Sequence, residues 1–306
     1  MPEAFIVDAV RTPTGKRGGG LAEVHPADLG AASITALIER TGVDPAAVDD
    51  VVFGNVDSIG GQAGDIARTC WLAAGMPEEV PGTTVDRQCG SGQQAVSFAA
   101  MGVMAGVQDL VVAGGVQQMS QIPISAAMLV AEPYGFTDPF SGSTGWVERY
   151  GTQEVSQFRG AEMIAEKWDI SRDAMEAFAF ESHERAIRAI DEGRFDAEIV
   201  PLGDCTMDEG PRRGGSVEKM QQLQPLVDGG RLTAAAGAQF QPGSYIAAFD
   251  WIHSVSAGGA VTTVQATKAS GEIYGAIMDA ENKRLIYGDW GPRALLTVDP
   301  VTGART

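Results

Sequence analysis

Cys89 is the residue whose setting best suits covalent chemistry. It stands between a short β-prone segment and a run of small and apolar residues, Gln93–Ala105, that is typical of a helix. A thiol at the start of a helix lies near exposed backbone N–H groups and the positive end of the helix dipole, and both favour the thiolate over the thiol. Since the thiolate is the form that attacks a carbonyl carbon, the sequence predicts a nucleophile at Cys89.

The neighbouring elements must position this thiol. Thr84–Asp86 is expected to form a strand, and Gly90 and Gly92 permit a tight bend directly after it. The helix follows, and the apolar strand Leu110–Val112 comes next, with an exit at Gly114–Gly115. This order predicts the strand–turn–helix geometry of a nucleophile elbow, with sulfur in place of a serine oxygen.

The helix after Cys89 is also unusual in its polarity. Its central part, Ala95–Val107, carries no charged residue and is rich in Ala, Gly and Met. A helix that is apolar all round is normally buried on every side. We therefore expect it to lie at the centre of the molecule.

A lone cysteine before a helix is more often a small buried hydrophobic residue than a nucleophile. The wider motif favours the nucleophile, because DRQCGSGQQAV followed by AGGVQQMS resembles the acyl-enzyme cysteine motif of the thiolases, the acetyl-CoA acetyltransferases and 3-ketoacyl-CoA thiolases. The resemblance implies that Cys89 takes an acyl group from a coenzyme A (CoA) thioester and passes it to a second CoA species. It implies no cofactor beyond these CoA thioester substrates.

Composition limits the remaining possibilities. The chain has 306 residues, 44% of them hydrophobic, which is enough for one large or two ordinary domains. A net charge of −18 argues against binding to nucleic acid or to an anionic membrane. Three cysteines without metal-ligand spacing are too few for a disulfide framework, so we expect a reducing, cytoplasmic environment. From these residues we expect no signal peptide, transit peptide or membrane-spanning segment.

The first 120 residues alternate between strand and helix patterns. Ala4–Val10 and Val51–Val56 are predicted strands, a helix capped by Asp28 should run to about Arg40, and Ala63–Ala74 is a second helix. This alternation predicts a mainly parallel, buried sheet of the βαβ type. The phrase RTPTGK, which follows the first strand, resembles the opening of most thiolases, although locally it reads as a turn at a strand exit.

Residues 121–239 change character and contain two amphipathic helices. Thr152–Trp168 is the first, and the second is capped by Ser171 and reaches Ile190 before Gly193. The phrase MIAEKWDISRDAMEAFAFESHERAIRAIDEGRFDAEIVPL resembles the loop domain that thiolases insert after their first sheet, and DEGPRR resembles the next landmark. The expected fold is an α/β, thiolase-like layered βαβ half, 1–120, a CoA-binding loop domain and return, 121–239, and a β-rich tail, 240–306.

The resemblance also implies positions that contact CoA. These candidates are Phe136 in GFTDPF, Arg149 and Tyr150 before Gly151, Arg212 at the adenine end, and Ala234 and Gly237 in TAAAGAQ. As plain residues the two arginines read as solvated surface charges, so only the resemblance raises them to candidates.

The match covers residues 4 to about 239 and then ends. The second half of a thiolase supplies an Asn in an NEAF phrase, a His in a GHP phrase and a second Cys in a CxGGG phrase, and this chain contains none of the three. Of its histidines, His25 and His183 are expected to be structural or solvated, whereas His253 lies beyond the end of the match, where a role as a general base is the less favoured interpretation. The predicted function is a thiolase-type acyltransferase with impaired activity. The alternatives are a non-catalytic acyl-CoA-binding or assembly subunit and the product of an interrupted thiolase gene. We expect a homo-oligomer or a partner thiolase subunit.

The tail, 240–306, reads as β-structure that does not match the family. The strand candidates are Ala260–Gln265, Ile273–Met278, Arg284–Tyr287 and Ala294–Val298, the middle pair flanking a turn at 279–282. A gene fusion, a frameshift or a divergent ending would each produce such a break.

Overall fold

The structure, a computed structural model, describes residues 3–234 and, as backbone, the strand segments 247–248, 251–255, 261–264, 273–279, 284–289 and 294–298. Contacts divide the chain into two compact units. Unit 1 comprises Met1–Thr152 and Arg185–Arg212, and unit 2 comprises Gln153–Glu184 and Arg213–Thr306. The three domains expected from the sequence stay a prediction.

Within the described part of the chain, none of the helices has the length and apolarity that crossing a bilayer requires.

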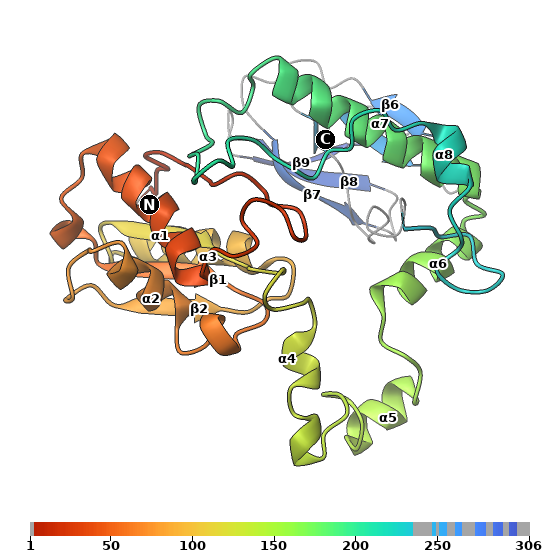
Figure 1. Ribbon diagram of the computed structural model, residues 1–306, viewed down its shortest axis with the longest axis horizontal. Coiled ribbons are helices and arrows are strands. Elements are labelled where there is room, and N and C mark those ends of the chain that lie inside the picture. The colour runs from red at the N-terminus through yellow and green to blue at the C-terminus, as the bar shows by residue number, and fades with distance from the viewer. Residues whose placement is uncertain are drawn as a thin grey trace. The chain divides into compact units, whose positions relative to one another are not determined.

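Unit 1 is built on a small parallel sheet (Figure 1). The strand order is β2-β1-β3, with Val51 opposite Gly82 on one side of β1 and Asp50 opposite Val111 on the other. The elements in chain order are α1 (Pro26–Thr41), η1 (Pro45–Ala47), β1 (Asp50–Gly54), η2 (Gly60–Gln62), α2 (Ile66–Ala73), β2 (Gly82–Val85), α3 (Ser91–Met104), β3 (Val111–Gly115), α4 (Ala126–Leu129), η3 (Glu132–Tyr134) and α5 (Thr144–Tyr150).

The two faces of this sheet carry different helices. Phe53 and its neighbours on one face form a buried apolar core with α1 and α2. Because successive side chains of a strand point to opposite faces, the adjacent Gly54 points to the other face, where the first turn of α3 lies against it. The core consists of Ala27, Ile34, Val48, Val51, Phe53, Ile66, Ala67, Cys70, Trp71, Val80, Val112 and Val116. The βαβ prediction for this region is therefore confirmed.

Two details of the N-terminal prediction are wrong. Ala4–Val10 is not a strand: Phe5 is 73% exposed and only the following residue, Arg11, forms a bridge, with Ile199. A β-branched run becomes a strand only when another strand pairs with it, and the described structure offers Ala4–Val10 none. The helix α1 is capped by His25, whose Nδ1 accepts from the N–H of Ala27, while Asp28 sits in the first turn. His25 is thus structural, as expected.

The expectation of complete burial fails for α3. Its small residues Ala95 and Ala99 are buried, but larger side chains on the outward face are exposed, and Met101 is 61% exposed. The exposed set is Val96, Phe98, Met101 and Met104. One sheet can cover only one face of a helix, so an apolar outer face stays open to solvent in this structure.

In unit 2, α6 (Gln157–Lys167) and α8 (Val217–Gln221) accompany α7 (Arg172–Asp191), which crosses the boundary between the units. A small core joins Ala161, Ala165, Ile170, Met175 and Leu232. The hydroxyl of Ser171 accepts from the N–H of Ala174, so the predicted cap of α7 is confirmed. The sequence predicted the start of α6 too early, since Ser156 caps it, and it missed α5 altogether.

The described strands after residue 246 form two antiparallel sheets. The strand order is β4-β5-β6 in the first and β7-β8-β9 in the second. Their bounds are β4 Ala247–Ala248, β5 Trp251–Val255, β6 Val261–Val264, β7 Ile273–Asp279, β8 Arg284–Asp289 and β9 Ala294–Val298. The turn candidate at 279–282 lies mostly outside the described residues, and the side chain of His253 in β5 lies wholly outside them.

Candidate functional site

Cys89 is exposed and lies in the turn between β2 and α3. The turn is closed at both ends by polar side chains. The Asp86 carboxylate accepts from the N–H of Gln88 at 2.8 Å. The Ser91 hydroxyl accepts from the N–H of Arg87 at 2.9 Å and donates to the carbonyl of Gln88 at 2.6 Å. These bonds hold the backbone on both sides of the thiol, so the predicted elbow is present.

The bend itself is made differently from the prediction. The left-handed residue is Gln88, with φ of 50°, whereas Gly90 has φ of −91°, which any residue adopts. The glycine that the geometry needs is Gly54 in β1, because a Cβ there would come within 2.3 Å of backbone atoms of Ser91 and Gly92. The N–H of Ser91 donates to the carbonyl of Gln88, and no side chain of the described residues caps α3, so the N–H groups of Gly92 and Gln93 in its first turn have no capping partner.

The other two cysteines are chemically different from Cys89. Cys70 is fully buried, and burial, together with the nearby Asp28 carboxylate, raises the pKa of its thiol to about 12. Burial also raises the pKa of Cys205, with a contribution from Glu209. Both thiols therefore stay protonated at neutral pH and are poor nucleophiles.

A buried polar network lies at the carboxyl ends of β1 and β3, which the sequence analysis missed. Asn55 donates to the carbonyl of Val116 at 2.7 Å and to Gln117 Oε1 at 3.1 Å. Asp57 accepts from Gln117 Nε2 at 3.3 Å. The signal was present in the sequence, since polar residues directly follow two apolar strands, and parallel strands end at one edge of a sheet.

RTPTGK is more than a turn, because it is bound to the DEGPRR phrase. The Arg11 guanidinium pairs with both oxygens of Asp208, at 2.6 and 2.9 Å, and its Nε donates to Glu198 at 2.6 Å. Asp208 also accepts from the N–H of Thr14 at 2.7 Å. Burial opposes ionisation of Asp208, but these hydrogen bonds outweigh it and lower its pKa. The hydrogen bond to Asp208 is also the main cause that raises the pKa of Arg11.

The positions suggested for CoA contact are distributed over both units. Phe136 is 61% exposed. The Arg149 guanidinium lies 5.3 Å from the centre of the Tyr150 ring, so the side chains of these two neighbours are in contact. Tyr150 also contacts Trp146, which stacks on Phe140. Arg212 is exposed in unit 1 and Ala234 is exposed in unit 2, and Gly237 lies outside the described residues. Their role in binding CoA stays a prediction.

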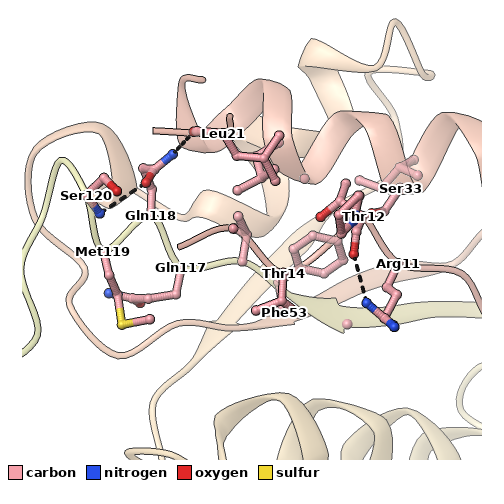
Figure 2. A pocket seen from close by; sticks show the side chains of 18 of the residues that line it. Arg11, Thr12, Thr14, Leu21, Ser33, Phe53, Gln117, Gln118, Met119 and Ser120 are labelled. Atoms are coloured by element: carbon pink, nitrogen blue, oxygen red, sulfur yellow. Dashed lines mark hydrogen bonds between the residues drawn. The ribbon is translucent and has the colours of Figure 1, made fainter. Parts of the chain in front are cut away.

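A cavity of about 600 Å³ lies in unit 1 along β3 and α1 (Figure 2). Figure 2 shows Phe53 between a polar end with Arg11 and Ser33 and another with Gln118 and Ser120. Its described lining does not include the turn 87–91, so the cavity is separate from the thiol. Among the described residues, no three His, Cys, Asp or Glu side chains are grouped so that they could hold a metal ion.

These features agree with comparisons to known proteins. Residues 4–247 match the family model described as "Thiolase, N-terminal domain". The chain belongs to the thiolase family. It is 60% identical to the steroid 3-ketoacyl-CoA thiolase FadA6 of Mycobacterium tuberculosis, over 80% of this chain and 61% of that thiolase. It is 38% identical to the β-ketoadipyl-CoA thiolase of Acinetobacter baylyi, over 74% of this chain and 60% of the relative.

A solved thiolase-family structure shows the same fold. The crystal structure of the Bacillus anthracis acetyl-CoA acetyltransferase is 32% identical, with a TM-score of 0.62 over 77% of this chain and 62% of that one. The chain thus spans about three fifths of the length of the thiolases that it matches. The thiolase-like α/β half predicted from the sequence is confirmed.

Proposed function

We propose that this chain forms an acyl-enzyme at Cys89 from a CoA thioester. The observation that carries the proposal is the exposed thiol in a hydrogen-bonded turn at the start of α3, in a chain of the thiolase family. The two other thiols are buried and have raised pKa values, so they do not compete for the acyl group.

The proposed step is a thioester exchange. The Cys89 thiolate attacks the thioester carbonyl, a new C–S bond forms to Sγ, and the bond to the CoA sulfur breaks. The electron pair leaves with CoA as its thiolate, which then takes up a proton. We propose that N–H groups in the first turn of α3, which no described side chain caps, stabilise the negative oxygen that develops during attack.

Later steps should be slow in this chain alone. It has no NEAF, GHP or CxGGG phrase, and the resemblance assigns to these the remaining proton-transfer groups and oxyanion donors. Loss of one oxyanion donor costs on the order of 10²–10³ in rate, and loss of a general acid or base costs about 10²–10⁴. Acyl transfer to a second CoA species, and carbon–carbon bond formation above all, should therefore be barely detectable.

A second candidate is an acyl-CoA-binding or assembly subunit that a partner thiolase chain completes. The exposed outer face of α3 favours it, because such a face suits a second protein surface. A partner that supplies the missing groups would restore turnover to this chain, whereas a slow enzyme would show the same rate with or without the partner.

The names of the relatives suggest the general metabolic setting. FadA6 is named for steroid 3-ketoacyl-CoA substrates and the Acinetobacter relative for β-ketoadipyl-CoA, so we propose acyl-CoA metabolism as the general setting. We also propose the cytoplasm as the compartment, because a catalytic thiol must stay reduced.

The test is mass spectrometry of the intact chain after incubation with acetyl-CoA and with longer acyl-CoA esters. We expect one acyl adduct that forms slowly, is absent in Cys89→Ala and persists in the matched variant Cys205→Ala. An adduct that survives in Cys89→Ala would place the nucleophile elsewhere. Release of acetoacetyl-CoA at the rate of an ordinary thiolase would show that the chain carries a full set of catalytic groups.

A further inference from the structure

Asp57 is a buried carboxylate whose partners are neutral. It is 1% exposed and has no salt bridge within the part of the chain that the structure describes. Its Oδ1 accepts from the N–H of Ala127 at 2.8 Å, and its Oδ2 accepts from the N–H of Ser125 at 3.2 Å. A buried charge is tolerated only when hydrogen bonds replace its hydration, so these N–H groups are tightly coupled to Asp57.

Asp57 lies at the same edge of the sheet as Cys89. The N–H of Asn55 donates to the carbonyl of Val85 at 3.1 Å, which joins the end of β1 to the end of β2. Cys89 follows Val85 by four residues and Asp57 follows Gly54 by three. Because all three strands are parallel, both residues leave the sheet at its carboxyl edge.

Gln117 fixes the position of Asp57. Its Oε1 accepts from Asn55 Nδ2 at 3.1 Å and from the N–H of Val56 at 3.2 Å, while its Nε2 donates to Asp57. The Gln117 side chain, just after the end of β3, therefore fixes the residues that follow the end of β1. A glutamate at this position would retain acceptors for Asn55 and Val56 but would place a second negative charge beside Asp57.

The groups that Asp57 holds begin the segment that carries three of the expected CoA contacts. Ser125 has φ of 70°, a conformation that costs energy for a residue other than glycine and persists only when its surroundings impose it. The helix α4 begins at the next residue, and the chain continues to Phe136, Arg149 and Tyr150. We propose that Asp57 is a positioning residue that anchors residues 125–150 at the Cys89 edge of the sheet and so sets the affinity for a CoA ester.

This inference rests on the proposed function, and the same sheet offers a control carboxylate that has the same kind of partners but is exposed. Asp49 lies at the opposite, amino end of β1, and its carboxylate likewise accepts two backbone N–H bonds, from Asp109 at 2.6 Å and Leu110 at 3.1 Å. Asp57→Asn turns one acceptor oxygen into a donor that faces an N–H group. Asp49→Asn makes the same change far from the thiol, and Gln117→Glu disturbs the anchor without altering Asp57.

The experiment measures alkylation of Cys89 by iodoacetamide with and without acetonyl-CoA, a ketone analogue that cannot transfer its acyl group. We expect acetonyl-CoA to protect the full wild-type chain. In Asp57→Asn and Gln117→Glu the concentration needed for protection should rise roughly tenfold, as expected when hydrogen bonds to a charged group are lost. The alkylation rate without the analogue should not change, because the turn bonds around Cys89 are intact. Asp49→Asn should behave as wild type.

Protection of Asp57→Asn at the wild-type concentration would overturn the proposal, and so would an equal loss in Asp49→Asn. Failure of acetonyl-CoA to protect the wild type would count against the proposed function itself. In that case amide hydrogen exchange of peptides covering 121–150 decides the anchor: faster exchange in Asp57→Asn than in Asp49→Asn supports it, and equal exchange overturns it.

Discussion

A β-carbon on Gly54 would lie 2.3 Å from the backbone nitrogen of Gly92. The first turn of α3 is therefore in contact with the bare backbone of the central strand, and the turn that carries Cys89 is attached directly to it. Few substitutions are possible at such a contact, since the neighbouring atoms belong to backbone that cannot rotate away.

Gly54→Ala should displace the start of α3. We expect a loss of about 1–3 kcal/mol in the free energy of unfolding, the usual cost of overpacking. The alkylation rate of Cys89 should also change, because the thiol lies two residues before α3 begins. Chemical denaturation and labelling kinetics measure the two effects.

The control for this substitution is Gly160→Ala in α6, where an added Cβ meets no atom within 4 Å. Alanine favours a helix over glycine by roughly 0.5–1 kcal/mol, so this variant should gain stability. If Gly54→Ala were as stable as the wild type with unchanged labelling, the close contact would not govern the elbow.

The second prediction concerns the three thiols. Near neutral pH, iodoacetamide should modify Cys89 faster than Cys70 or Cys205, because Cys89 is exposed and burial raises the pKa of the other two. Peptide mass spectrometry after timed quenching gives the three rates. Modification of Cys70 or Cys205 at an equal or greater rate would mean that the described burial is not that of the protein in solution.

The elbow was predictable because its signals are local. A β-prone segment, a cysteine and a charge-free helix follow one another within residues 83–107, and neighbours in sequence decide their structure. The pairing of Arg11 with Asp208 was not predictable in this way, since 197 residues separate the two side chains. Nothing in the sequence around either residue indicates the other, and only the tertiary fold brings the two side chains together.

The wrong predictions share one physical cause. Ala4–Val10 has the pattern of a strand, and α3 has the pattern of a helix buried on all sides. Such a pattern shows only that a segment can pair with another strand or pack against other elements, and not that the fold supplies them. Phe5 and Met101 are both exposed because the described chain offers no surface against them. Asp57 was missed because the sequence shows only a single acidic residue in a loop. It does not indicate which backbone N–H groups the carboxylate will bind in the folded chain.

The third prediction is a pH dependence from Asp208. Its pKa is lowered from the ordinary value of 3.8, so its ionised form stabilises the fold at pH values above 3.8, and this stabilisation is lost as the pH falls through the lowered value. Asp208→Asn should lower the free energy of unfolding by about 1–3 kcal/mol at pH 7, as expected for hydrogen bonds to a charged group. Below about pH 4 the difference from wild type should shrink.

Urea denaturation at a series of pH values measures this difference. Asp204→Asn, which removes an exposed carboxylate from the same segment, is the control and should follow the wild-type curve. A deficit of Asp208→Asn that stays constant down to acid pH would show that the ion pair with Arg11 does not stabilise the fold.

The last prediction concerns the outer face of α3. Val96, Phe98, Met101 and Met104 lie exposed on a helix without charged residues, and buried apolar surface contributes about 25 cal/mol per Å². We therefore expect the purified chain to self-associate and to bind a dye for apolar surface, and Met101→Lys to reduce both effects. Met163→Lys on α6 replaces a methionine of similar exposure, 52% against 61%, and should change neither. Light scattering and dye fluorescence provide the measurement, and a monodisperse wild-type monomer without dye binding would show that another part of the chain covers this face in solution.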